Sequence, residues 1–156
     1  MSRALRDALG QWATGVAIVT THHDGQDVGL TCNSFASVSL EPALVLWSIQ
    51  HDSNCYDAFA KGGGYCVNIL TEADADLVWK FTKGEQVERF NGVDVTRLDS
   101  GRVRLTNALA WFDCELHQPI AAGDHDILLG QVQAFAHQSA PPVLFGQGKL
   151  GRLDAL

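Results

Sequence analysis

The chain has 156 residues, of which 46% are hydrophobic and 19% charged, and its formal net charge at pH 7 is −7. This length and apolar content suit one folded domain and exclude intrinsic disorder. The acidic balance, without a basic stripe, argues against nucleic-acid binding. The apolar runs are too short for a membrane-spanning helix, and the N-terminus has no signal-peptide core. We therefore expect a single domain over residues 1–156, located in the cytoplasm, with no membrane or nucleic-acid partner.

The sequence contains four cysteines, and no two of them have the C-x-x-C spacing. That spacing is typical of zinc ribbons and thioredoxin-like sites. Without a secretory signal, we expect the cysteines to be reduced, mostly buried and structural.

The first elements in chain order are a short helix and a β-hairpin. Ser2 is a typical N-cap, and Leu5, Leu9 and Trp12 recur at helical spacing before Gly15. The segments 16–21 and 27–32 are rich in strand-forming residues, and Asp-Gly at 24–25 favours a tight hairpin turn between them.

The rest of the chain is mostly strand. We expect strands at 43–50, 65–70, 108–117, 127–137 and 143–145, and short helices at 54–61, capped by Ser53, and 73–82. Three glycines at 62–64 end the first of these helices. Residues 84–107 are polar and carry no clear pattern. Strands joined by tight turns favour antiparallel pairing, and a small Greek-key barrel is the natural closure.

The sequence has no G-x-G-x-x-G after the first strand and no P-loop, H-E-x-x-H or G-x-S-x-G motif. Its candidate functional residues lie instead in two polar segments. Residues 29–39 hold five hydroxyl or amide side chains, which either bind a polar ring or satisfy their own loop backbone. His125 lies between Asp124 and Asp126, as a charged switch, a metal ligand or a surface turn. Adjacent strand residues point to opposite faces, which disfavours a metal site here.

Together, these segments make the sequence similar to the short-chain flavin reductases of two-component monooxygenases. The resemblance covers nearly the whole chain in order. Its motifs are ATGV at 13–16, GLTCNSF at 29–35, SVSLEP at 37–42, VNIL at 67–70, AWFDC at 110–114, GDHDI at 123–127 and GRL at 151–153.

The resemblance implies a mainly β fold of the FMN-binding split-barrel type, namely a six-stranded antiparallel Greek-key barrel with short flanking helices, working as a homodimer. It places the flavin in a groove at the subunit interface and His125 near the nicotinamide. The residues that it implies at the flavin are Thr31, Cys32, Asn33, Ser34, Ser48, Ile49, Gln50, Ser53, Asn54, Lys80 and Phe81. Ser53 and Asn54 are expected at the flavin phosphate, where free backbone N–H groups at a helix start favour an anion.

The implied activity is reduction of FMN or FAD by NADH or NADPH, with the reduced flavin diffusing to a separate monooxygenase. Hydride passes between the two cofactors directly, so no catalytic triad is needed. Two departures from the family pattern concern the site. Cys32 replaces a common alanine, which flavin binding should tolerate, and Leu150 replaces a tyrosine, which bears on nicotinamide affinity. The alternatives are a flavin-retaining oxidoreductase or oxidase and a non-catalytic flavin- or haem-binding module on the same barrel.

Overall fold

The computed structural model describes residues 2–154, and β-strands form most of its regular structure. The helices are α1 (Arg3–Leu9), α2 (Tyr56–Lys61), the 3₁₀ turn η1 (Glu72–Asp74), α3 (Leu77–Lys80) and α4 (Gln86–Phe90). The strands are β1 (Thr14–Gly15), β2 (Ala17–His23), β3 (Gln26–Cys32), β4 (Ala36–Leu40), β5 (Ala43–Gln50), β6 (Gly64–Ile69), β7 (Val95–Arg97), β8 (Val103–Leu105), β9 (Ala110–Ala122), β10 (His125–His137), β11 (Val143–Gly146) and β12 (Lys149–Arg152).

The main sheet has seven antiparallel strands in the order β3-β2-β6-β9-β10-β5-β4. The expectation of a mainly β, antiparallel fold with short helices is confirmed, but the expected number of six strands is wrong for this sheet. The strand without a counterpart in our element-by-element expectations is β4. It is short and mostly exposed, and a register shift between Ser37 and Ser39 interrupts its pairing, although its residues alternate between apolar and polar.

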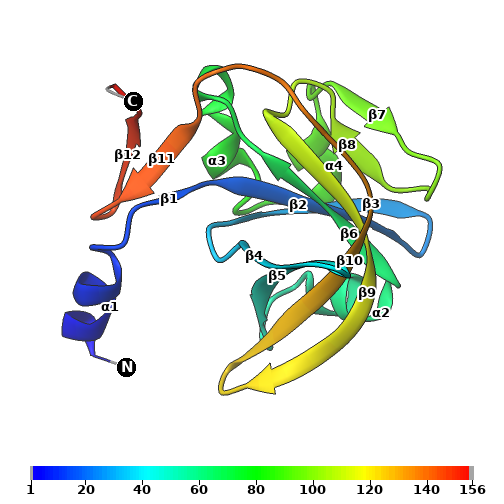
Figure 1. Cartoon of the computed structure of the whole chain (residues 1–156), viewed down its shortest axis with the longest axis horizontal. Coiled ribbons are helices and arrows are strands. Elements are labelled where there is room, and N and C mark those ends of the chain that lie inside the picture. The colour runs from blue at the N-terminus through cyan, green and yellow to red at the C-terminus, as the bar shows by residue number, and fades with distance from the viewer. Residues whose placement is uncertain (1, 155–156) are drawn as a thin grey trace.

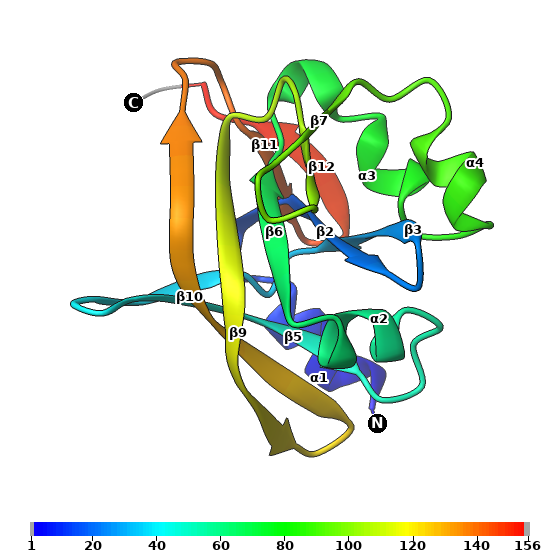
Figure 2. The same cartoon turned by 90° about the vertical axis from the view of Figure 1, so that its right-hand side faces the viewer.

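The main sheet curls around a hydrophobic core, and the long β9–β10 hairpin runs along the whole molecule (Figures 1 and 2). At the centre of this core Trp47 is fully buried and meets the rings of Phe59 and Tyr65 edge-on, with centroids 4.8 and 5.9 Å away. Such pairs stabilise a core beyond their buried area. These ring contacts pack β5 against α2 and β6.

A second core lies on the other face of β2. Ala17 and Val19 point into the first core, while Val16 and Ile18 pack with Phe81 and other apolar residues beneath α3 and β11. A strand buried on both faces has no polar alternation. This explains the continuous apolar run that marked this strand in the sequence.

Several local expectations are confirmed. Ser2 Oγ accepts a hydrogen bond from Leu5 N at 3.2 Å and caps α1. The β2–β3 turn has Asp24 and Gly25 at φ values of 52° and 74°, as a primed hairpin turn requires. The four cysteines are free, and all but Cys32 are buried.

Other boundaries are different from those expected. Helix α2 begins at Tyr56 instead of residue 54, because Ser53 Oγ accepts from Cys55 N and forms a turn ahead of the helix. The helix expected at 73–82 is divided into η1 and α3. The unassigned segment 84–107 contains α4 and the β7–β8 hairpin.

One residue of β9 that faces away from the first core, Asp113, is buried next to the β7–β8 hairpin. Asp113 points away from the first core, as the alternation of its strand predicts, but it is only 4% exposed. Its Oδ1 lies 2.7 Å from Nε of Arg102, which is itself almost buried. A buried carboxylate needs such a partner.

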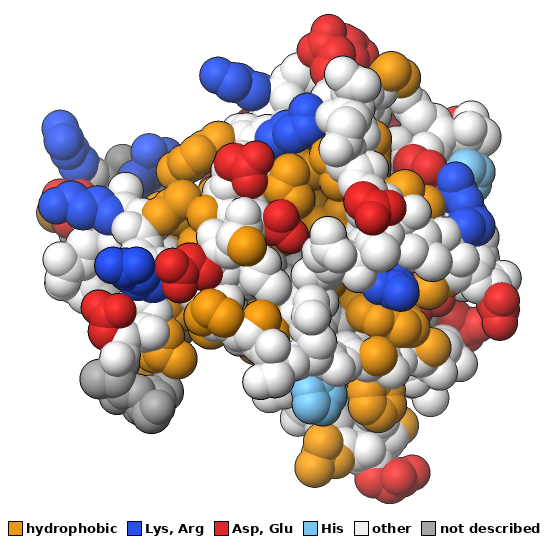
Figure 3. Space-filling view, turned by 90° about the horizontal axis from the view of Figure 1, so that it is seen from above, with side chains coloured by type: hydrophobic (Ala, Val, Ile, Leu, Met, Phe, Trp, Pro, Cys, Tyr) orange, Lys and Arg blue, Asp and Glu red, His pale blue; other side chains and the backbone are white. Residues whose placement is uncertain are grey.

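Helix α1 stands apart from the main sheet (Figure 1), and none of its residues is buried. The exposed fractions of Leu5, Leu9 and Trp12 are 48%, 64% and 80%. On the face seen from above, patches of hydrophobic side chains also reach the surface between charged ones (Figure 3). Among residues 2–154, no helix is long and apolar enough to cross a membrane.

Candidate functional site

A cavity of about 320 Å³ opens where the ends of β3 and β5 meet the start of β10. It is lined by Leu30, Thr31, Cys32, Asn33, Ser34, Trp47, Ser48, Ile49, Gln50, Ser53 and His125. Most residues that the sequence suggested for a flavin site lie here together. Leu30 and Trp47 were not expected, although both stand next to expected residues in the chain.

Strand pairing brings these distant segments together. The β5–β10 register places His125 opposite Gln50, so the histidine from the end of the chain lies beside the end of β5. On the other side, Ser34 Oγ accepts a hydrogen bond from Ser48 N at 3.0 Å. This contact fixes the segment after β3 against β5 and gives the cavity two defined walls.

The cavity wall is polar but almost uncharged. Asn33, Ser34 and Gln50 present amide and hydroxyl groups at the exposed mouth, and the lining also includes the apolar residues Leu30, Trp47 and Ile49. Such a lining suits a flat ring that is apolar on its faces and polar along its edge. Within residues 2–154, no carboxylate lines the cavity. The amide and hydroxyl groups of the lining can bind and orient a ligand.

Two lining residues are held by the fold. Thr31 Oγ1 donates to the Val78 carbonyl at 2.6 Å, so its side chain ties β3 to α3. Burial raises the pKa of the Cys32 thiol to about 12, which keeps it protonated at neutral pH. Neither side chain is a nucleophile.

His125 is the ionisable side chain at the cavity mouth and is about one-third exposed. Its Nδ1 lies 2.6 Å from Asp124 Oδ1. The hydrogen bond with His125 lowers the pKa of the Asp124 carboxyl. The contact fixes the ring and leaves Nε2 available to a ligand. Among residues 2–154, no group of three or more metal-ligating side chains is placed to hold a metal ion.

The structure does not bring the remaining three expected residues into this cavity. Asn54 lines a neighbouring polar cavity of about 370 Å³. Lys80 Nζ donates to the Glu88 carbonyl at 2.9 Å. The Phe81 ring is fully buried against Phe90 in the second core. Only the Phe81 carbonyl approaches the site, accepting from Thr31 N at 3.2 Å.

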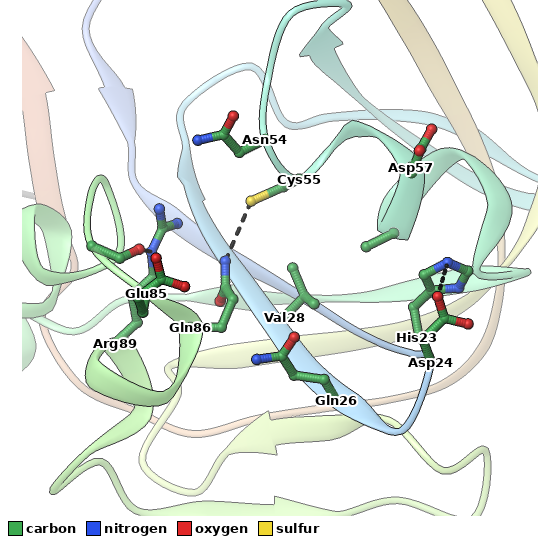
Figure 4. A pocket seen from close by; sticks show the side chains of 12 residues that line it. His23, Asp24, Gln26, Val28, Asn54, Cys55, Asp57, Glu85, Gln86 and Arg89 are labelled. Carbon is green, nitrogen blue, oxygen red and sulfur yellow. Dashed lines mark hydrogen bonds and ion pairs between the residues drawn. The ribbon is translucent and has the colours of Figure 1, made fainter.

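The neighbouring cavity lies between α2, α4 and the β2–β3 hairpin (Figure 4). Arg89 at its inner end is almost buried, and its guanidinium donates to the carbonyls of Gly29, Phe81 and Gly84. Gln86 Nε2 lies 3.3 Å from Cys55 Sγ. These contacts hold α4 against β3, so Arg89 serves the fold of the cavity wall.

The position that departs from the family pattern, Leu150, lies on β12 opposite Phe145. It packs against the second core. Leu150 therefore makes an apolar contact with the core at the position where the family pattern has a tyrosine.

One set of residues beside the cavity was not identified from the sequence. Asp126, directly after His125, accepts from Tyr56 at the start of α2 and contacts His51 at the end of β5. The partners are 70 and 75 residues away from Asp126 in the chain. No local pattern could have indicated them.

Comparison with known proteins agrees with this geometry. Residues 9–154 match the model of the flavin reductase like domain, and the chain belongs to this family. It is 37% identical over 153 residues to the FMN reductase (NADH) SmoA of Agrobacterium fabrum, covering 98% of this chain and 87% of that protein. It is 36% identical over 149 residues to the reductase subunit HsaB of a flavin-dependent monooxygenase from Mycobacterium tuberculosis, covering 94% of this chain and 79% of HsaB.

A solved structure gives the same result. The NADH:FAD oxidoreductase SgcE6 of Streptomyces globisporus, in complex with NAD and FAD fragments, is similar to this chain with a TM-score of 0.91 and 30% identity. The similarity covers 96% of this chain and 91% of that one.

Proposed function

We propose that the protein is an NAD(P)H-dependent flavin reductase that transfers hydride to FMN or FAD and releases reduced flavin to a separate monooxygenase. The observation that carries this proposal is the neutral, polar-edged cavity that combines the 31–34 segment, the end of β5 and His125. NADH as the reductant is supported by the similarity to an FMN reductase (NADH) and to an NADH:FAD oxidoreductase.

The cavity residues fit a flavin ring. Its volume of about 320 Å³ lies in the range of ligand sites, and its amide and hydroxyl groups match the polar edge of the ring. The bound flavin supplies an electron-accepting ring, to which the nicotinamide gives its hydride directly while solvent supplies the proton. Asn33, Gln50 and Ser53 would hold the ring edge and its side chain. Donors placed there also stabilise the charge gained on reduction.

His125 would orient the nicotinamide through the Nε2 atom. Its ring is set by Asp124, and it stands at the mouth of the cavity, where a second ligand can approach the first. An orienting contact of this kind raises the rate by holding the reacting atoms in line. Direct hydride transfer between the two cofactors requires no acid or base from the protein.

We further propose that the protein is a homodimer, that residues 1–156 form one domain, and that the main sheet corresponds to a Greek-key split barrel. The dimer is supported by the exposed apolar side chains of Leu5 and Leu9 on α1 and of Trp12 just after it. The open mouth of the cavity, where Asn33, Ser34 and Gln50 are exposed, would be completed by the second subunit.

The proposal is tested by steady-state oxidation of NADH and of NADPH with FMN or FAD added in turn to the purified protein. We expect oxidation that depends on added flavin and saturates with it. A tightly bound flavin that reduces oxygen without added flavin would indicate a flavin-retaining oxidase. Flavin or haem binding without oxidation of NADH or NADPH would indicate a non-catalytic binding protein.

A further inference from the structure

Beneath the candidate flavin cavity, one almost buried carboxylate joins two elements. Asp126 is 7% exposed. Its Oδ1 lies 2.7 Å from Nε2 of His51, and its Oδ2 accepts the Tyr56 hydroxyl at 2.5 Å. The rings of His51 and Tyr56 also meet edge-on, with centroids 5.8 Å apart. Each carboxylate oxygen thus has its own partner.

The two partners of Asp126 flank the turn between β5 and α2. His51 directly follows β5, Tyr56 is the first residue of α2, and Ser53 lies between them. Backbone hydrogen bonds within the turn run from Ser53 N to the Gln50 carbonyl and from Tyr56 N to the Ser53 carbonyl, at 3.2 and 3.0 Å. A single carboxylate therefore holds both ends of the turn that places Ser53 in the cavity wall.

Asp126 does not itself line the cavity. It pairs with Ile49 of β5, and strand alternation places its side chain on the opposite face from that of His125. A third tie connects the same elements, because His51 N donates to the Asp124 carbonyl at 3.0 Å. The turn is thereby attached to the start of β10 on the side away from the ligand.

Resting on the proposed function, we propose that Asp126, His51 and Tyr56 form a positioning unit that holds the β5–α2 turn in the conformation needed to bind flavin. A turn of this length, with an exposed Asn54 at its tip, would otherwise sample several conformations. Fixing it before the ligand arrives removes an ordering cost from binding. The unit acts on flavin affinity because Asp126 contacts both ends of the turn, whereas the His125 ring contacts the Asp124 carboxylate.

The test measures the flavin dissociation constant by fluorescence titration, and the NADH KM at saturating flavin, for wild type and variants. Tyr56→Phe and Asp126→Asn each break one arm of the unit and should weaken flavin binding about 2- to 10-fold, the effect of one hydrogen bond. The NADH KM should stay unchanged. His51→Gln keeps an N–H donor and should bind flavin more tightly than His51→Ala.

A matched control is Asp113→Asn, which also neutralises an almost buried, paired carboxylate, on the neighbouring strand β9 and outside the cavity. It should lower the melting temperature without changing flavin affinity. Unchanged flavin affinity in Tyr56→Phe and Asp126→Asn would overturn the positioning unit, and so would an equal loss of affinity in Asp113→Asn. Tyr56→Phe, which removes one hydroxyl group, keeps the test valid if Asp126→Asn does not fold. Failure of the wild type to oxidise either NADH or NADPH with added FMN or FAD would instead overturn the proposed function.

Discussion

Substitutions of the exposed residues Asn33 and Ser34 can distinguish an effect on ligand binding from an effect on folding. The reason is that the two side chains differ in their contacts within the protein. Ser34 Oγ exchanges hydrogen bonds with the backbone of Ser48, accepting from N at 3.0 Å and donating to O at 3.4 Å. Within residues 2–154, the Asn33 side chain makes no hydrogen bond to the protein. Asn33→Ala should therefore affect only the ligand, whereas Ser34→Ala should affect both the ligand and the fold.

The expected magnitudes follow from hydrogen-bond energies. Loss of a hydrogen bond to flavin costs about 0.5–1.5 kcal/mol, so each variant should raise the flavin dissociation constant about 2- to 10-fold. Loss of the Ser34–Ser48 contacts should cost about 1 kcal/mol of unfolding free energy, which lowers the melting temperature by about 2–4 °C. Asn33→Ala should leave the melting temperature unchanged.

Flavin titration and thermal denaturation of the same samples provide the assay. Asn107→Ala is a suitable control, because Asn107 is an exposed amide in the β8–β9 connection, away from the cavity. An Asn33→Ala variant with wild-type flavin affinity would refute the assignment of Asn33 to the site. A Ser34→Ala variant with wild-type stability would refute the structural role of its contact with Ser48.

Three further predictions concern the nicotinamide contact, the assembly and the pH dependence of stability. His125→Ala should raise the NADH KM or slow reduction of bound flavin in stopped-flow measurements while leaving flavin affinity unchanged; loss of thermal stability with normal kinetics would restrict His125 to fixing its turn. Light scattering should report a dimer that is weakened by Trp12→Ser in the segment after α1, and a stable monomer that still binds flavin would contradict this. Hydrogen bonds from Tyr56 and His51 lower the pKa of Asp126, so the folded state binds fewer protons than the unfolded state. Stability in urea should therefore fall as pH drops below about 4. Tyr56→Phe should flatten this acid slope, and an unchanged slope would show that the contact is not maintained in solution.

The parts of the fold that could be predicted from the sequence are those with a strong local pattern. The β5 bounds, Ala43–Gln50, coincide with those of the apolar run, because its alternate residues Val45, Trp47 and Ile49 enter the first core. The hairpin turn at residues 24–25 follows from the φ values that Asp and Gly accept. By contrast, β4 and the strands of the β7–β8 hairpin are only three to five residues long, and they form because a neighbouring strand supplies their hydrogen bonds.

The part of the site that could be predicted from the sequence is the part implied by the family resemblance. The 31–34 segment, the end of β5 and His125 meet in one cavity. Phe81 does not join them, because its ring is needed in the core where it packs on Phe90, and its motif position alone could not indicate this. The Asp126 contacts depend on strand register and on a helix start two residues later than expected, so they required the structure.

The central claim is most directly tested by mixing the purified protein with FMN and a stoichiometric amount of NADH in the absence of oxygen and following the visible absorption of the flavin. The account predicts that the flavin absorption bleaches as one NADH is consumed for each flavin, and that the reduced flavin is recovered free of the protein after ultrafiltration. Flavin that binds in the cavity but keeps its oxidised spectrum in the presence of NADH and NADPH would contradict it.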